Sequence, residues 1–156
     1  MTAPIPFEMA LKSSMDKLLF DFAVANSLDY IDLDGAELNS ERLLEARNAV
    51  AWSQTHFSPH PGNNPFYTFV FDVGAVTPKD QDASQFKSME IVGLLLATFR
   101  PQALFEVYDW YTSSTVVTGS KRGDFSVARS SVASLAVNGV EGFRAISVET
   151  MGVRYG

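Results

Sequence analysis

Two histidines, His56 and His60, stand four residues apart, the spacing that places two metal ligands on one face of a helix. Pro59 and Pro61 flank the second histidine, and proline interrupts a helix because it has no backbone N–H. The chain contains no cysteine, which excludes disulfides and thiolate metal sites. We therefore expect the histidines to lie in a loop, and we predict neither a metal site nor a cofactor.

Acidic residues form two close pairs, Asp32/Asp34 and Asp80/Asp82, each in a polar, turn-like segment. The first pair resembles part of a calcium loop, but the alignment puts Tyr30 at the first ligand position, where a carboxylate belongs. Carboxylates in polar turns are ordinarily solvated. We therefore interpret both pairs as surface turns.

The sequence lacks the short motifs that organise common catalytic sites. It has no Gly-x-Ser-x-Gly elbow and no Gly-x-Gly-x-x-Gly loop, and residues 119–121 lack the upstream glycine of a phosphate loop. Tyr108, Trp110 and Tyr111 would line a pocket for a small ligand, but aromatic residues at helical spacing more commonly form a core. We predict that the protein is not an enzyme, and a small ligand-binding domain is the less favoured alternative.

Lys121 and Arg122 are the adjacent basic residues of the chain, and glycines at 119 and 123 flank them. This composition is typical of a mobile loop, which we expect over residues 118–124. The net charge of −6 opposes general binding to nucleic acid, which needs clustered cations. We interpret the pair as a contact to an acidic partner surface or to passing DNA, and a solvated loop is the simpler alternative.

The length of 156 residues and an apolar content of 46% indicate one folded domain over residues 1–156. Residues 28–48 are a candidate inserted segment within it. The longest apolar run, residues 91–99, is far shorter than the ~20 residues that cross a bilayer. We expect a soluble protein with no membrane contact.

The first half of the chain predicts one helix and two strands. Residues 6–26 carry apolar side chains at three- and four-residue steps, which indicates an amphipathic helix. A strand over residues 50–57 stops at Phe57-Ser58-Pro59, and a second strand spans residues 66–76. That strand is apolar on both faces, and such strands are covered on both faces. One face carries Tyr67, Phe69 and Phe71, and the other carries Phe66, Thr68 and Val70.

The second half predicts a strand over residues 89–100, because its Ile, Val and Thr favour strands and Gly93 weakens a helix. A second helix is expected over residues 103–113, where apolar side chains fall on one helical face. Two closing strands, residues 125–137 and 142–155, meet at an Asn-Gly hairpin signal. Gly152 suggests a bulge in the last strand.

These elements predict an α+β fold with a single antiparallel or mixed sheet of about five strands. Two main helices pack on one face of the sheet, so the opposite face needs a cover. A neighbouring copy of the chain is the simplest source, and closed rings are one common arrangement.

The strand over residues 50–59, ending in Phe57-Ser58-Pro59, is similar to the strand that ends in a Phe-x-Pro corner in the tail terminator proteins of long-tailed bacteriophages. Further matches are Gly93-Leu94-Leu95-Leu96 leading to Arg100-Pro101, and the closing Phe143-Arg144-Ala145-Ile146-Ser147-Val148. The element order resembles that family over residues 8–155.

The resemblance implies a structural virion protein, assembled in the host cytoplasm into the tail. It would form a hexameric ring on the tail tube, end tube polymerisation and meet the head connector or neck proteins. Tyr67, Phe69 and Phe71, or the opposite set of the same strand, are then expected near a subunit contact. The main alternative is another ring-forming tail component, such as a tube, neck or baseplate protein.

Overall fold

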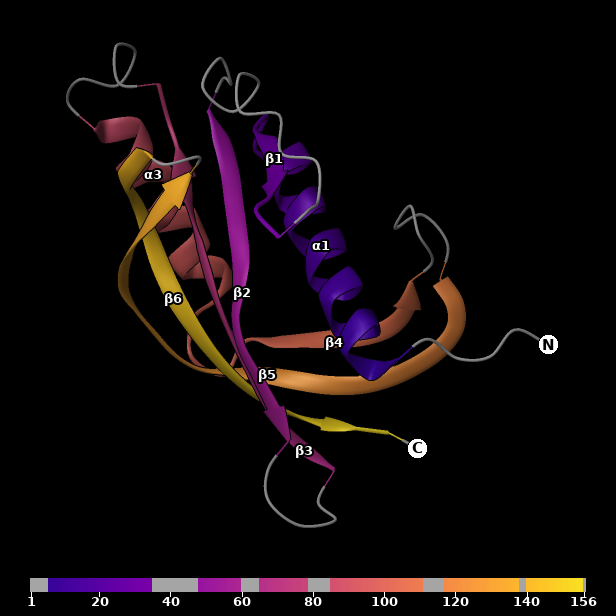
Figure 1. Cartoon of the computed structure of the whole chain (residues 1–156). Coiled ribbons are helices and arrows are strands. Elements are labelled where there is room, and N and C mark those ends of the chain that lie inside the picture. Colours follow the sequence, from indigo (N-terminus) through magenta and orange to yellow (C-terminus); the bar gives the residue numbers. More distant parts are fainter. Residues whose placement is uncertain are drawn as a thin grey trace.

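The computed structural model describes residues 6–34, 48–59, 65–78, 85–110, 117–137 and 140–155. A single mixed sheet runs in the order β1-β2-β3-β6-β5-β4 and curls into a half-barrel (Figure 1). Within these described ranges, β1 and β2 are the one pair of strands that runs parallel. Along the chain the elements are α1 (Phe7–Ala25), β1 (Asp29–Asp32), β2 (Ala49–Pro59), β3 (Phe66–Val76), α3 (Phe86–Thr98), β4 (Leu104–Trp110), β5 (Val117–Val137) and β6 (Val140–Arg154).

The predicted α+β class, with two helices and one mixed sheet, is confirmed for these residues, but the sheet has six strands rather than about five. The predictions for the first helix and for β2 and β3 are also confirmed. The extra strand, β1, lies at one edge of the sheet. It falls within residues 28–48, for which the sequence predicted no helix or strand.

Helix α1 lies across the open side of the half-barrel (Figure 1). Leu11, Met15 and Leu19 recur every four residues on its inner face and are fully buried. They join Trp52 of β2 and Phe69 of β3 in the main hydrophobic core. The apolar stripe read from the sequence is therefore the stripe that packs on the sheet.

The strand predicted over residues 89–100 is wrong, because this segment is the helix α3. Ile91 and Leu95 are buried one helical turn apart, and the Phe99 ring packs edge-on against Phe71 with centroids 5.2 Å apart. The apolar residues surround the whole helix, so the segment shows no clear period. Arg144 of β6 anchors the start of this helix through two hydrogen bonds to the Gln85 side chain, at 2.8 and 3.1 Å.

The helix predicted over residues 103–113 is also wrong where the structure describes it, because β4 occupies this segment. Phe105 and Val107 are buried, whereas Leu104 and Glu106 are exposed, which is the alternation of a half-buried strand. Pairing with β5 decides the conformation here, because the sequence pattern of seven residues fits both periods.

The loop predicted over residues 118–124 is the first part of β5, which pairs with β4 on one side and β6 on the other. The bulge predicted at Gly152 is absent, because Gly152 pairs directly with Phe125. A Cβ at this glycine would lie 2.3 Å from Cγ of Phe125, so glycine makes room for the ring. The two register shifts in this hairpin instead lie in β5, between Val127 and Arg129 and between Leu135 and Val137.

Both helices contribute to one core, on the face of the sheet that carries Phe69 and Phe71. The opposite face also holds a smaller apolar cluster at one end. Its buried members are Ile31, Ala49, Ala51, Val76, Leu135 and Ala145. The second face is therefore partly covered in the single chain.

Candidate interaction surface

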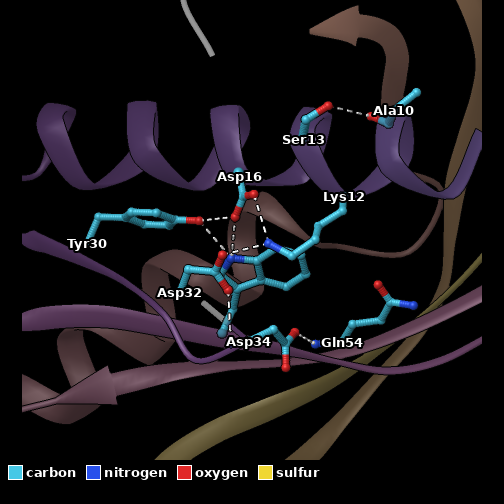
Figure 2. Close-up of polar contacts among 9 residues, drawn as sticks. Ala10, Lys12, Ser13, Asp16, Tyr30, Asp32, Asp34 and Gln54 are labelled. Atoms are coloured by element: carbon cyan, nitrogen blue, oxygen red, sulfur yellow. Dashed lines mark hydrogen bonds and ion pairs between the residues drawn. The ribbon is translucent and has the colours of Figure 1, made fainter. Parts of the chain in front are cut away.

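A compact polar cluster joins α1 to β1 and β2 (Figure 2). Nζ of Lys12 lies 3.0 Å from Oδ2 of Asp16 and 2.6 Å from Oδ2 of Asp32. The Tyr30 hydroxyl donates to Oδ1 of Asp16, and Nε1 of Trp52 donates to the same oxygen at 3.0 Å. The Lys12 ammonium also lies 5.3 Å from the centroid of the Trp52 ring.

Burial is the largest single influence on the pKa values of the titratable groups in this cluster. Burial raises the pKa of Asp16, although hydrogen bonds from Tyr30 and Lys12 act in the opposite direction. Burial lowers the pKa of Lys12, but the hydrogen bonds to Asp32 and Asp16 outweigh it, and the pKa is raised. Burial next to Asp16 also raises the pKa of Tyr30. Every polar group here is engaged with another, so we interpret the cluster as a clasp between helix and sheet.

Helix α1 is held on its other side by Ser14. The Ser14 hydroxyl accepts a hydrogen bond from the backbone N–H of Tyr108 at 3.0 Å and donates to its carbonyl oxygen at 3.3 Å. One serine thereby occupies two backbone groups at the edge of β4. The helix is fixed to both sides of the half-barrel, and the sequence offered no signal for either contact.

The structure places Lys121 and Arg122 in β5, on a surface that balances their charge. Lys121 lies 2.7 Å from Oδ1 of Asp124 and 3.4 Å from Oε1 of Glu106. Arg122 lies over the ring of Phe7, 6.0 Å from its centroid. These neighbours weaken the interpretation of the pair as a DNA contact. The carboxylates of Asp124 and Glu106 carry as much negative charge as Lys121 and Arg122 carry positive charge.

The apolar face of β3 named from the sequence is largely internal. Phe69 and Phe71 are fully buried under the helices, so a partner does not reach them in this structure. Tyr67 is half-buried, and its ring stacks on Phe57 with centroids 5.2 Å apart. The opposite set of β3 faces outward and begins with the exposed Phe66.

The remaining candidates show no reactive arrangement. His56 lies in β2, paired with Val70, and not in the predicted loop. It is exposed, and its Nε2 lies 3.0 Å from the Ser58 hydroxyl. Among the residues that the structure describes, no group of three or more metal-ligating side chains comes together. Predictions that involve His60, Asp80, Asp82, Tyr111 and residues 35–47 lie outside the described residues, as does the side chain of Trp110.

The outward face of α3 carries exposed apolar side chains that the sequence analysis missed. Phe86 is 72% exposed, Met89 46% and Leu96 45%. Gly93 lies between them on the same side, and a Cβ built there meets no atom within 4 Å. Glu90 lies on the same side and pairs with Lys87 at 3.5 Å, so the exposed apolar side chains surround one surface ion pair. Exposed apolar side chains gathered on one helix face indicate a contact with a partner.

Two exposed apolar side chains, Leu104 and Met151, lie in a row with polar residues on the outer face of the sheet. The register places Leu104 opposite Ser126, Ser126 opposite Met151, and Met151 opposite Thr68. Leu104 is 78% exposed, and Met151 is exposed beside it on this face.

No protein-family model and no curated protein matches the chain. No helix among the described residues is long and apolar enough to cross a membrane.

Proposed function

We propose that the protein is a structural part of a phage tail: a ring of identical copies that caps the tail tube, ends its polymerisation and meets the head connector. The observation that carries the proposal is the outward face of α3, with Phe86, Met89 and Leu96 exposed to solvent in the single chain. Burying such side chains yields about 1.5–3 kcal/mol each, which favours association.

The polar chemistry of the chain supports a structural role. Asp16 and Tyr30, whose pKa values are both raised by burial, are tied into the clasp between α1 and the sheet. A catalytic acid or base needs a free approach to a substrate atom, and both groups are instead bonded to their neighbours. The exposed apolar side chains of α3 and the pair Leu104 and Met151 on the outer face of the sheet lie on two separate surfaces, and each subunit of a ring makes two contacts.

The direct test adds purified protein to growing tail tubes and measures tube length. We expect growth to stop at a length set by the time of addition. The variant Leu96→Glu should lose this effect, because a carboxylate would be buried in the contact. Val24→Glu, at an exposed position of α1, is the matched control and should cap normally. Equal capping by both variants, or no arrest by the wild-type protein, contradicts the proposal.

A tube subunit is the second candidate, favoured by the long hairpin of β5 and β6. The two strands pair from Gly123 to Val137, a length suited to lining the lumen of a tube. The same assay separates the two functions, because a tube subunit lengthens the tubes and becomes part of them.

A further inference from the structure

Strand β5 has a free edge along its second half. Its first half pairs with β4, and this pairing ends at Ser126 opposite Leu104. The backbone N–H of Val127 donates to Ala103 at 2.9 Å, and its carbonyl oxygen accepts from Gln102 at 2.8 Å. From residue 128 to Val137, the part of the chain that the structure describes places β6 on one side of β5 and no strand on the other.

Proteins ordinarily block strand addition with charged side chains, proline, bulges or very short strands. Arg129 and two register shifts, between Val127 and Arg129 and between Leu135 and Val137, lie at the ends of this edge, and its centre has none of these features. Residues 130–134 are Ser-Ser-Val-Ala-Ser, without charge or proline. Val132, at the centre, is 94% exposed. The backbone groups that have no strand partner on this edge and the exposed side chain of Val132 together favour pairing with another strand.

We propose that two copies of the chain pair through this edge, antiparallel, with Val132 of each copy beside the two-fold axis. The regular part of the free edge runs from Arg129 to Leu135, between the two register shifts, and Val132 is its midpoint. The Ser130 hydroxyl donates to the carbonyl oxygen of Phe99 at 3.1 Å, so the end of α3 lies beside this stretch. Antiparallel pairing about the midpoint uses the whole regular edge of both copies. Ser130 then lies opposite Ser134, and Ser131 opposite Ala133.

Charge is compatible with the same register. Arg129 is the charged residue of this edge, and its Nε lies 2.7 Å from Oε2 of Glu149 on β6. It lies opposite Leu135 of the second copy when Val132 is central. The two Arg129 side chains then start six residues apart along the strands, roughly 20 Å, which exceeds the Debye length of about 8 Å. A register shifted toward Arg129 shortens the pairing and brings the two guanidinium groups together. The central register therefore combines the most backbone hydrogen bonds with the least repulsion.

A two-fold contact of this kind closes at two copies and covers an edge that would otherwise promote aggregation. It does not use the outward face of α3. The pairing goes beyond the proposed tail function and does not depend on it.

The absence of native cysteine allows a register-specific test by disulfide formation. Residues directly opposite in an antiparallel pair have Cα atoms about 4.5–5.5 Å apart, within the disulfide range of about 4.4–6.8 Å. Under mild oxidation Val132→Cys should give a covalent dimer. Ser131→Cys alone should not, whereas a mixture of Ser131→Cys and Ala133→Cys should. Val24→Cys, exposed on α1, measures random collision.

The proposal is overturned if Val132→Cys cross-links no faster than Val24→Cys, or if Ser131→Cys cross-links with itself as readily as with Ala133→Cys. A protein that forms rings and arrests tubes without these cross-links would disprove the pairing and leave the tail function standing. Correct cross-links in the oxidised protein, together with tubes that keep growing in the presence of the reduced protein, would disprove the tail function and leave the pairing standing.

Light scattering gives a second readout without cysteine. The wild-type protein should be dimeric in the micromolar range, and Val132→Lys should raise the dissociation constant at least tenfold, because like charges meet across the axis. Circular dichroism checks its fold, and Val24→Lys is the matched control. A strictly monomeric wild-type protein at several hundred micromolar, or a Val132→Lys dimer as tight as wild type, would refute the pairing.

Discussion

Lys12 separates two carboxylates that would otherwise face each other in a partly buried site, with its ammonium 3.0 Å from Asp16 and 2.6 Å from Asp32. Replacing it with methionine keeps the length of the side chain but leaves both carboxylates without their cation. We expect Lys12→Met to lower the free energy of unfolding by about 1–3 kcal/mol at pH 7, the usual range for breaking charged hydrogen bonds. Urea unfolding measures this change.

The pH dependence of the same variant has a definite sign. A carboxyl whose pKa is raised by folding contributes a stability that falls as pH increases from its ordinary value through the raised value. Asp16 is such a group, and loss of Lys12 raises its pKa further. The deficit of Lys12→Met should therefore shrink as the pH falls toward 4. In the wild-type protein, the contribution of Lys12 should disappear as pH rises above 10.5 through its raised pKa.

Lys17 supplies the control for this prediction, because it pairs with Asp21 on the exposed side of the same helix at 2.7 Å. Exposed pairs at this spacing are worth about 0.3–0.5 kcal/mol. Lys17→Met should therefore change stability little and show no comparable pH dependence. Equal effects of the two variants would show that the clasp contributes no more than a surface ion pair.

At the scale of elements, the sequence predicted α1, β2 and β3 because their residues show one clear period. Leu11, Met15 and Leu19 follow the helical repeat, and the Phe57-Ser58-Pro59 corner marks the end of β2. The sequence predicted a strand where α3 lies and a helix where β4 lies. Ile91 and Val92 favour strands locally, and only packing of Ile91 and Leu95 on the sheet makes the helix the better solution.

A substitution at Gly93 tests whether the outward face of α3 is uncovered in the free chain. Within a helix, glycine is less favourable than alanine by about 0.5–1 kcal/mol, and the Cβ of an alanine here would meet no atom within 4 Å. Gly93→Ala should therefore stabilise the free chain by this amount, as thermal or urea unfolding would show.

The same substitution at Gly152 should have the opposite sign, because its Cβ would fall 2.3 Å from the Phe125 ring. We expect a loss of about 1–3 kcal/mol, typical of overpacking. A destabilising Gly93→Ala would show that the outward face of α3 is already covered in the free protein, and the argument for a partner there would fail.

At the scale of the whole molecule, the sequence did not predict how the half-barrel is closed. The contacts that place α1 between the two sides join residues far apart in the chain: Ser14 with Tyr108, and Asp16 with Trp52. Serine and aspartate at these positions match the polar pattern of a solvated helix face, so no local signal marks them. The candidate surface was missed for the same reason, because the outward side of α3 is defined only once its inner side is known.

The tail-capping proposal and the strand-pairing proposal together predict a form of the protein that cannot cap tubes, the disulfide-linked Val132→Cys dimer. A ring whose two faces meet different partners relates its copies by rotation about the ring axis, and no two-fold axis lies between neighbours. The antiparallel pair therefore has to separate before its members enter such a ring. We expect the oxidised dimer to leave tube growth unchanged and the reduced protein to arrest it, with tube length measured before and after a reductant is added. Val24→Cys treated in the same way should cap throughout. Arrest by the oxidised dimer would mean that the paired edges belong to the assembled tail, and that the ring is built on two-fold contacts.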